Sequence, residues 1–418
     1  MKCLGTGLVG DLQTGGEAVA ITTTDLVAPA GFKASLFGRT RAPDPDGSTK
    51  PGGLMSSAAH VVVGGGYAAV AAVRRFRELR PDAPVTWVTD RPDLLLRSRM
   101  ITLPLSEPKS VTVALDAVAS ALSADLVVSS VHRIDLRERS VHFGAGDVSY
   151  DSLIIATGAV SDRASHPGAA DVLHPCERGD AVSLAQAAGR AGRVLVVATG
   201  QRPGPAVEWA AHVAAVGAAE VTLVDDAGVM QALLGQRGWR LVSRRLSETG
   251  RGAQVVEGVV ANVAPSAVEL ADGRRIEADV VALCGALCGT PVGLPPELLD
   301  ERGFVRCTDR LQIPGHHPGF AAGDIVSLAG MPALQKTWVF AERMGAQAAT
   351  NAIRVLNGQP PEPPKLGRAA RAAMALPDLH GYAVLTRNRR VLLRGGVAAR
   401  LKERMEKRYL RTLPQATR

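Results

Sequence analysis

The stretch His60-Val-Val-Val-Gly-Gly-Gly-Tyr-Ala-Ala69 joins a short run of strand-forming residues to a glycine loop and the first turn of an alanine-rich helix. Its small residues follow the spacing Gly64-x-Gly66-x-x-Ala69. Glycines at this spacing let the backbone turn tightly and approach a pyrophosphate held at the helix N-terminus. The order of strand, loop and helix therefore predicts a dinucleotide-binding unit.

The segment after this loop completes the expected unit. Apolar residues recur at helical spacing over residues 67–79. In the stretch Val85-Thr-Trp-Val-Thr-Asp90 that follows, Val85–Val88 reads as a second buried strand. An acidic residue at the end of that strand accepts hydrogen bonds from an adenosine ribose. Asp90 is the candidate, one residue later than usual, with Thr89 in the usual place. From this motif alone, a strand-to-helix turn that binds no nucleotide remains the alternative.

Three further segments favour a flavin nucleotide. Tyr150-Asp-Ser-Leu-Ile-Ile-Ala-Thr-Gly158 reads as a buried strand whose end passes close to a bound cofactor. In Gly319-Phe-Ala-Ala-Gly-Asp324 the acid would bond a ribityl hydroxyl. A helix over residues 336–351 would point its dipole at the flavin ring edge. Lys336 is a candidate catalytic cation beside the flavin N1 and O2 edge, and a surface lysine at a helix start is its alternative.

Together these segments resemble the FAD-dependent pyridine nucleotide oxidoreductases, in the branch of the apoptosis-inducing-factor-like ferroptosis suppressor and the type II NADH dehydrogenases. The resemblance also rests on Ile134-Asp135-Leu136 before a hairpin and on Leu311-Gln312. It implies an α/β fold with two Rossmann-like domains of the glutathione-reductase type, one for FAD and one for NAD(P)H, plus a small α+β C-terminal region. The FAD-binding residues that it implies are Gly64, Gly66, Ala69, Asp90, Val131, Thr157, Gly158 and Asp324.

The expected domain boundaries follow from the same motifs. Residues 1–58 have linker composition, rich in Gly, Thr, Ala and Pro, and are predicted to be a flexible N-terminal extension. Residues 59–167 and 290–358 are predicted to form two parts of the FAD domain. Residues 168–289 between them are the expected NAD(P)H-binding domain, and residues 359–418 form a basic C-terminal region.

The second nucleotide motif, in the run from Val194 to Asp225, departs from the family pattern. Members of the family usually show three near-consecutive glycines and a fourth before Val-Glu, whereas here Gly200-Gln-Arg-Pro-Gly204 carries an apparent insertion. Proline lacks a backbone donor for phosphate, although Arg202 would supply charge instead. A working nicotinamide site and a degenerate one therefore both stay open.

In a working second site, Gly200 and Gly204 would approach the nucleotide. Asp225 would accept a hydrogen bond from the ribose 2′-hydroxyl and repel a 2′-phosphate, which favours NADH over NADPH. Glu208 would lie beside the nicotinamide as a candidate catalytic residue, and an exposed helix carboxylate is its alternative.

The five scattered cysteines argue against a disulfide framework and for a reducing compartment, with the cytoplasm as the expected location. The segment 93–102, one of the two places where disulfide reductases carry a redox pair, has no cysteine. Cys284-Gly-Ala-Leu-Cys288 is the one close pair. We interpret Cys284 as a buried apolar residue rather than a redox group. No neighbouring ligands complete a metal site, so none is predicted.

The charge of this 418-residue chain is concentrated at its C-terminal end. Residues 361–418 hold fourteen Lys and Arg against four Asp and Glu, a net +10, whereas the whole chain carries +8. A helix is predicted over residues 397–411, with an apolar stripe between basic faces. This helix either lies on an anionic bilayer, which would make the protein peripheral on the membrane, or packs on the protein's own sheet. No nucleic-acid-binding motif and no apolar run of transmembrane length is present.

These observations predict an FAD-dependent NAD(P)H oxidoreductase that passes hydride from NADH, rather than NADPH, to FAD and on to a quinone-like or other small acceptor. The quinone is in doubt, because residues 338–345 lack the Gln-rich motif of the type II dehydrogenases. One alternative is a flavin-dependent oxidase or dehydrogenase that acts directly on an organic substrate with a degenerate nicotinamide site. Another is an FAD-binding redox sensor without turnover. No oligomeric state is predicted.

Overall fold

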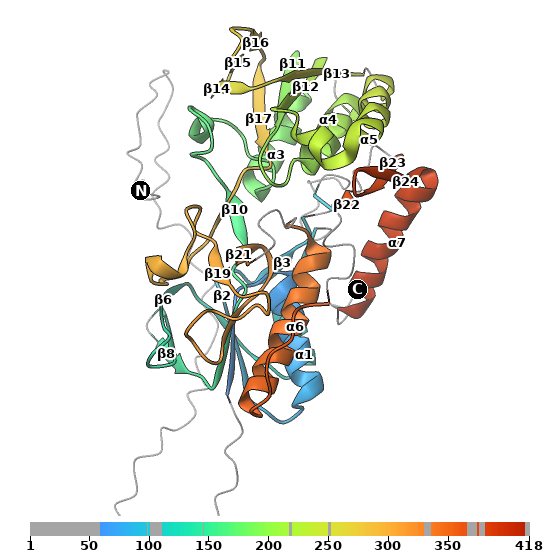
Figure 1. Cartoon of the computed structure of the whole chain (residues 1–418). Helices are drawn as coiled ribbons and strands as arrows, with labels where there is room; N and C mark the ends of the chain where they lie inside the picture. The colour runs from blue at the N-terminus through green and yellow to red at the C-terminus, as the bar shows by residue number, and fades with distance from the viewer. Residues whose placement is uncertain are drawn as a thin grey trace, which may run out of the picture. The chain divides into compact units, whose positions relative to one another are not determined.

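The computed structural model describes residues 59–97, 99–100, 111–144, 146–216, 220–249, 252–329, 336–365, 374–375 and 381–413 (Figure 1). The predicted N-terminal extension, residues 1–58, lies outside these described residues.

The first sheet has five parallel strands in the order β20-β9-β1-β2-β5. Helices α1 and α6 pack against each other, where a Cβ on Gly345 would lie 2.0 Å from the Ala68 carbonyl oxygen. Late strand β20 joins the early strands, so both predicted parts of the FAD domain contribute to one sheet. The bounds are β1 (His60–Val63), α1 (Tyr67–Leu79), β2 (Val85–Thr89), β5 (Asp125–Val128), β9 (Ser152–Ile155), β20 (Gly319–Ala321) and α6 (Trp338–Leu356).

The second sheet has four parallel strands in the order β13-β12-β11-β17 and its own buried core. A separate antiparallel sheet of β14, β15 and β16 packs against it. Two parallel sheets with helices confirm the predicted pair of Rossmann-like units. The bounds are α3 (Arg178–Ala188), β11 (Arg193–Ala198), α4 (Gly204–Val216), β12 (Glu220–Asp226), α5 (Val229–Glu248), β13 (Ala253–Gly258), β14 (Val260–Ala264), β15 (Ala267–Leu270), β16 (Arg275–Glu277) and β17 (Val280–Cys284).

Smaller elements connect and flank the two sheets. The hairpin expected after Ile134-Asp135-Leu136 is present as β6, β7 and β8. Strands β10 and β18 pair where the chain leaves the first unit and returns to it. The bounds are β3 (Asp93–Leu95), β4 (Thr112–Ala114), α2 (Leu115–Ala121), β6 (Val131–Asp135), β7 (Ser140–Phe143), β8 (Gly146–Ser149), β10 (Ala159–Ser161), β18 (Leu287–Gly289), β19 (Val305–Cys307) and β21 (Val326–Leu328), with 3₁₀ turns at Ala169–Asp171, Pro296–Leu298 and Gly323–Ile325.

The C-terminal region is the predicted small α+β unit, with β22 (Met374–Ala375), β23 (Ala383–Arg387), β24 (Arg390–Gly395) and α7 (Gly396–Thr412). Val384 joins the buried cluster of the second sheet, whereas its neighbour Ala383 packs on Ala398 and Ala399 of α7. Because successive strand residues point to opposite faces, the small sheet lies between α5 and α7. The helix thus packs on the protein's own sheet. None of the helices in the described part of the chain combines the length and the apolar character that a membrane crossing requires.

Candidate functional site

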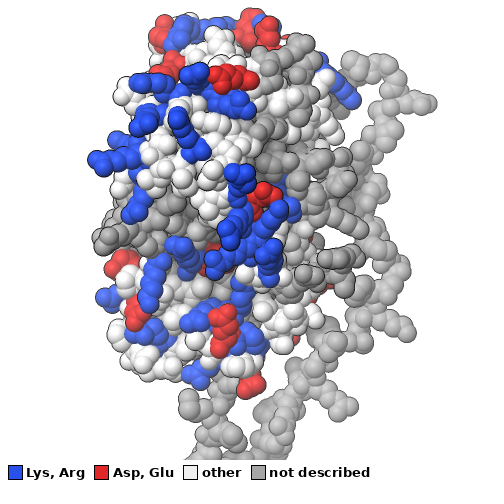
Figure 2. All heavy atoms as spheres, turned by 90° about the vertical axis from the view of Figure 1, so that its right-hand side faces the viewer, with Lys and Arg blue, Asp and Glu red and all other residues white. Residues whose placement is uncertain are grey.

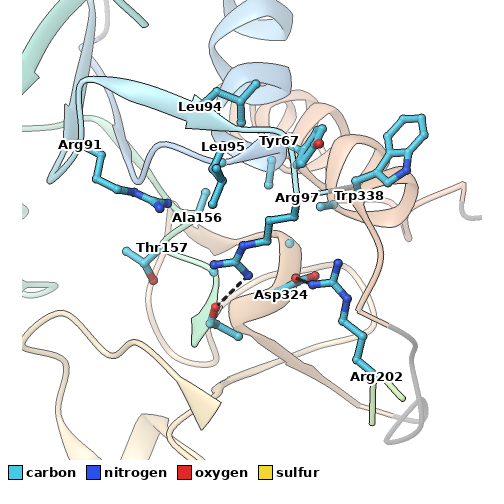
Figure 3. A pocket seen from close by; sticks show the side chains of 16 residues that line it. Tyr67, Arg91, Leu94, Leu95, Arg97, Ala156, Thr157, Arg202, Asp324 and Trp338 are labelled. Atoms are coloured by element: carbon cyan, nitrogen blue, oxygen red, sulfur yellow. Dashed lines mark hydrogen bonds and ion pairs between the residues drawn. The ribbon is translucent and has the colours of Figure 1, made fainter. Parts of the chain in front are cut away.

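A cavity of about 80 Å³, partly open to solvent, lies at the carboxyl ends of β20, β9 and β1 (Figure 3). Ligands of open parallel sheets bind at this edge. Backbone at Gly66, Gly158 and Gly323 lines the cavity, together with the aromatic rings of Tyr67 and Trp338. The segments that the sequence singled out therefore meet around one space.

The glycine loop is shaped by two different constraints. Gly64 has φ +123°, and a Cβ there would lie 2.3 Å from the Ala156 carbonyl oxygen, so only glycine lets β1 pass so close to the end of β9. Gly66 has extended backbone and would place a Cβ in open space beside the cavity. Gly66 is also the N-cap of α1 and offers no side-chain cap, so the first amides of the helix remain available to an anion. Ala69 is fully buried one turn later.

Asp324 follows β20 in the turn Gly323–Ile325 and points into the cavity (Figure 3). Its Oδ2 lies 4.0 Å from Nη1 of Arg202. Its Oδ1 is buried and accepts no hydrogen bond from any described residue. A buried carboxylate oxygen without a donor is costly, and a hydroxyl of a bound polyol chain would supply that donor. Gly158, with φ +79° and open space at its Cβ position, lies on the same cavity wall.

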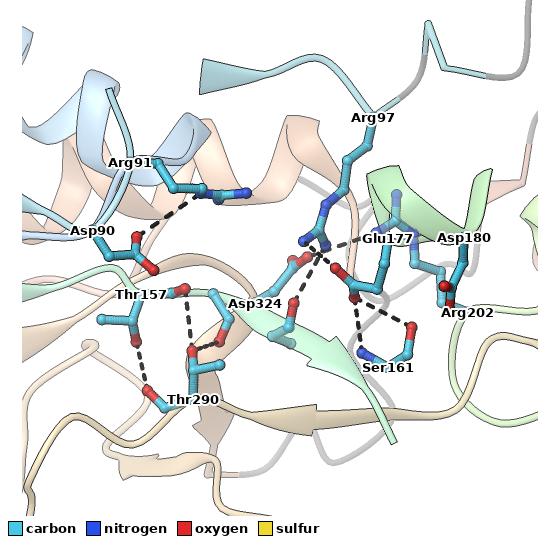
Figure 4. Close-up of polar contacts among 12 residues, drawn as sticks. Asp90, Arg91, Arg97, Thr157, Ser161, Glu177, Asp180, Arg202, Thr290 and Asp324 are labelled. Atoms are coloured by element: carbon cyan, nitrogen blue, oxygen red, sulfur yellow. Dashed lines mark hydrogen bonds and ion pairs between the residues drawn. The ribbon is translucent and has the colours of Figure 1, made fainter. Parts of the chain in front are cut away.

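Three arginines line the cavity against this single carboxylate: Arg91, Arg97 and Arg202 (Figures 3 and 4). Arg97 donates to the Ala159 carbonyl at 3.3 Å, and Arg202 comes from the loop before α4. The excess of guanidinium groups suits an anionic ligand such as a diphosphate. Sequence reasoning missed Arg91, which directly follows the candidate acid Asp90, and Arg97, which follows the short strand β3.

The chain crosses between the two sheets beside the cavity, and two threonines tie the crossing strands together (Figure 4). Thr157 Oγ1 donates to the Thr290 carbonyl at 3.0 Å, and Thr290 Oγ1 lies 3.2 and 3.0 Å from the carbonyl oxygens of Thr157 and Gly158. These bonds hold the predicted residues Thr157 and Gly158 in place. No sequence motif pointed to Thr290.

The residues predicted to serve the adenosine lie farther from the cavity. Asp90 follows β2 with a side chain 66% exposed, 3.9 Å from the guanidinium of Arg91. Thr89 is buried, and its Oγ1 would lie 2.5 Å from a Cβ on Gly65. Thr89 therefore packs against the glycine loop at Gly65, whereas the Asp90 side chain lies at the surface. Val131 begins β6 and is half-buried.

The second glycine loop is fixed to the end of β17. Thr199 N donates to the Cys284 carbonyl at 2.9 Å, and Arg202 N donates to the Gly285 carbonyl at 3.1 Å. Gly200 has φ +65°, and a Cβ there would lie 2.7 Å from Ala286 Cα. Gly204 begins α4 and has open space at its Cβ position. Two of the loop amides are thus bonded to protein carbonyls rather than directed at a ligand.

Asp225 and Asp226 end β12 in different environments. Asp225 is fully buried; its Oδ1 accepts from Met230 N at 2.9 Å, and its Oδ2 has no donor among the described residues. Burial raises the pKa of Asp225 to about 6. Asp226 accepts from Thr199 Oγ1 at 2.6 Å and from Val260 N at 2.9 Å, and despite its burial these bonds and His166 lower its pKa. A ribose therefore reaches Asp225 only if the surrounding chain moves.

The two predicted catalytic residues do not line the cavity. Lys336 is buried; its ammonium donates to the Val326 carbonyl and lies 4.4 Å from the centre of the Phe304 ring. Burial lowers the pKa of Lys336, while the charge of Asp324 opposes that shift. Glu208 is also buried on α4, rather than exposed, and forms an ion pair with Lys402 of α7. Among the described residues, no three His, Cys, Asp or Glu side chains come together as a metal site.

Comparison with known proteins gives one family. Residues 58–354 match the family described as pyridine nucleotide-disulphide oxidoreductase. The nitric oxide reductase FlRd-NAD(+) reductase of Aeromonas hydrophila subsp. hydrophila is 30% identical over 291 residues, which cover 66% of this chain and 73% of that protein.

Solved structures share the fold. The sulfide:quinone oxidoreductase of Aquifex aeolicus superposes with a TM-score of 0.73 at 20% identity, over 85% of this chain and 91% of that one. The water-forming NADH oxidase of Lactobacillus brevis, solved bound to NADH, superposes with a TM-score of 0.65 at 20% identity, over 79% and 75% of the two chains.

Proposed function

Because the chain belongs to the pyridine nucleotide-disulphide oxidoreductase family, we propose that it is an FAD-dependent enzyme passing hydride from NADH to FAD and on to a quinone-like or other small acceptor. FAD and a nicotinamide nucleotide are the cofactors of this family. The observation that carries the proposal is the cavity beside Gly66, which joins a helix N-terminus, three arginines and the buried, donor-less Oδ1 of Asp324.

The residues around the cavity fit FAD. In this proposal the diphosphate is held by the amides at the start of α1, a helix without a side-chain cap, and by the guanidinium of Arg91, which lines the cavity. Asp324 Oδ1 accepts from the ribityl chain, and Gly66 and Gly158 let backbone approach the ligand closely. Asp90 and Val131 flank the adenosine. When bound, FAD supplies the hydride chemistry, and the chain supplies binding, orientation and charge.

Residues 168–289 are proposed to bind the nicotinamide nucleotide, with Gly200, Gly204 and Asp225 facing its ribose and diphosphate. Asp225 favours NADH, because a carboxyl at this place repels a 2′-phosphate. Glu208 is proposed to lie beside the nicotinamide once α7, which now pairs with Glu208 through Lys402, has moved away. Lys336 is proposed to act through Asp324, because the Asp324 carboxylate interacts electrostatically with the Lys336 ammonium.

A second candidate is a flavin enzyme or sensor with a degenerate nicotinamide site. Two observations favour it: Asp225 is fully buried, and the amides of Thr199 and Arg202 are already bonded to the end of β17. The two candidates differ in one property. Only the first has its bound flavin reduced by NADH.

The part of the protein that meets the electron acceptor is proposed to face an anionic membrane through α7. Figure 2 shows Lys and Arg gathered on the face that this helix contributes, where Arg400, Arg404, Lys407, Arg408 and Arg411 line a shallow groove with Glu403. Because the helix buries Ala398, Ala399 and Tyr409 in the protein, binding is expected to be electrostatic. Sedimentation with vesicles of anionic lipid at low salt tests this. Arg404→Glu with Arg411→Glu should abolish it, and binding to neutral vesicles alone would contradict it.

Asp324→Ala tests the position of FAD. The variant should lose FAD on purification, because it removes the proposed acceptor for the ribityl chain. Asp309→Ala is the matched control, since the Asp309 side chain is 64% exposed and lies 3.8 Å from Nε of its neighbour Arg310. A fully flavinylated Asp324→Ala protein would refute the proposed placement of the cofactor.

A further inference from the structure

Two cysteines distant in sequence meet beside the second glycine loop. Leu173 pairs in parallel with Ala282, and Leu283 N donates to the Leu173 carbonyl at 2.8 Å. The segment that follows Leu173 therefore runs along β17 and brings Cys176 to the strand end at Cys284. The two thiols are close enough for each to change the pKa of the other. Both are buried, with 5% and 0% of their surface exposed.

The pair is electrostatically asymmetric. The Cys284 thiol lowers the pKa of Cys176 against the effect of burial, and the nearby charges of Arg202 and Arg97 lower it further. Burial raises the pKa of Cys284. One sulfur is therefore the better thiolate and the other keeps its proton, which is the arrangement that disulfide formation requires. Cys307 is buried without such a partner, and burial raises its pKa to about 12.

The position of Cys284 connects the pair to both proposed cofactor sites. Its carbonyl accepts the amide of Thr199, and the next carbonyl accepts the amide of Arg202. The side chain of Arg202 then extends into the cavity to 4.0 Å from Asp324 (Figure 4). Next to Cys176, Glu177 lies 4.0 Å from Arg97, which lines the same cavity. A bond between the two sulfurs would fix the strand end that carries this loop.

We propose that Cys176 and Cys284 form a reversible disulfide, closed by a hydroperoxide, that locks the loop 199–204. The Cys176 thiolate attacks the peroxide, the O–O bond breaks, and a sulfenic acid and hydroxide form. The Cys284 sulfur then displaces the sulfenic oxygen, the S–S bond forms, and its thiol proton leaves with that oxygen as water. Two thiols lose two electrons, and one hydrogen peroxide becomes two waters.

Locking is expected to slow the nicotinamide step, a consequence that rests on the proposed function. In the described position Arg202 occupies the cavity and the loop amides are bonded to β17, so a nicotinamide needs the loop to open. A disulfide at the base of the loop opposes that opening. Reduction of the bound flavin by NADH should therefore be slower in the disulfide form by roughly five- to 150-fold, the range of couplings between linked sites.

The flavin-loaded full chain is treated with hydrogen peroxide, quenched, denatured and alkylated, and its thiols are counted and mapped by mass spectrometry. Wild type should lose two alkylatable thiols, give one linked peptide containing Cys176 and Cys284, and recover both thiols with dithiothreitol. Cys307→Ala should behave as wild type. Cys284→Ala should give no link and leave a sulfenic acid on Cys176 that dimedone traps. An unchanged thiol count, or a link to another cysteine, would overturn the pair.

Anaerobic kinetics test the second half of the proposal. Oxidised wild type should reduce its flavin more slowly than the dithiol form, and peroxide should not change the rate of Cys284→Ala. Equal rates for the two wild-type forms would overturn the coupling to the loop. If the dithiol form itself shows no reduction by NADH, the proposed function fails, while the thiol count still decides whether the disulfide forms.

Discussion

Replacing two glycines of the first loop by alanine separates folding from cofactor binding. Gly64→Ala places a Cβ 2.3 Å from the Ala156 carbonyl oxygen and keeps φ near +123°. The backbone conformation alone costs roughly 1–3 kcal/mol for a residue with a Cβ. The overlap with backbone adds to this, because neither strand end moves without breaking sheet hydrogen bonds. We expect the apoprotein to lose at least about 2 kcal/mol of unfolding free energy.

Gly66→Ala makes the same chemical change two residues later with the opposite outcome. Gly66 has φ −95° and ψ −174°, and its Cβ would meet no atom within 4 Å. The apoprotein should therefore keep its unfolding free energy within about 0.5 kcal/mol. The added methyl group projects beside the proposed diphosphate position, however. FAD affinity should fall at least about tenfold, equivalent to about 1.4 kcal/mol.

Thermal melts of the apoproteins and titration with FAD, followed by quenching of flavin fluorescence, measure both effects. Wild-type FAD affinity in Gly66→Ala would refute the placement of the cofactor against this loop. A wild-type melting temperature in Gly64→Ala would refute the tight crossing of β1 and β9.

Two further perturbations follow from buried charges. Burial raises the pKa of Asp225 from 3.8 to about 6, so the folded state holds a proton there that the unfolded chain has lost, and this group's stabilising contribution falls as the pH rises through that window. Asp225→Asn removes this pH dependence. The unfolding free energy of the variant relative to wild type should rise by up to about 3 kcal/mol between pH 4 and pH 7. A difference that does not depend on pH would contradict the burial of the Asp225 carboxyl. Lys402→Met removes the ion pair between α7 and Glu208 and should speed hydrogen exchange of the α7 amides. Lys407→Met loses only an exposed pair within the helix and should leave that exchange unchanged. Equal exchange in both variants would show that the ion pair with Glu208 does not hold α7.

The local order of the first unit was predictable from sequence. The strand His60–Val63, the helix Tyr67–Leu79 and the strand beginning at Val85 have the predicted bounds, because buried parallel strands and an alanine-rich helix carry strong periodic signals. The C-terminal helix was also predicted. The sequence left open whether that helix faces a membrane or the protein. In the structure Ala398 and Ala399 of the helix pack on the sheet, whereas Val397 is 55% exposed.

The parts of the site that the sequence missed depend on contacts between distant segments. Arg97 follows a short strand with no motif, and only the fold brings it to Glu177 and the cavity. Burial of Asp225 depends on the helix that follows it, and the ion pair of Glu208 depends on a lysine near the end of the chain. The proposed partner of Cys284 is Cys176 rather than the nearby Cys288, because the pairing of Leu173 with Ala282 brings the Cys176 segment to the end of β17.

Anaerobic mixing of the flavin-loaded protein with NADH tests the central proposal most directly. Hydride transfer predicts rapid loss of the visible flavin absorbance with NADH, and slower loss with NADPH, whose 2′-phosphate Asp225 would repel. Flavin that stays fully oxidised with both nucleotides, in protein whose cysteines are reduced, would contradict it.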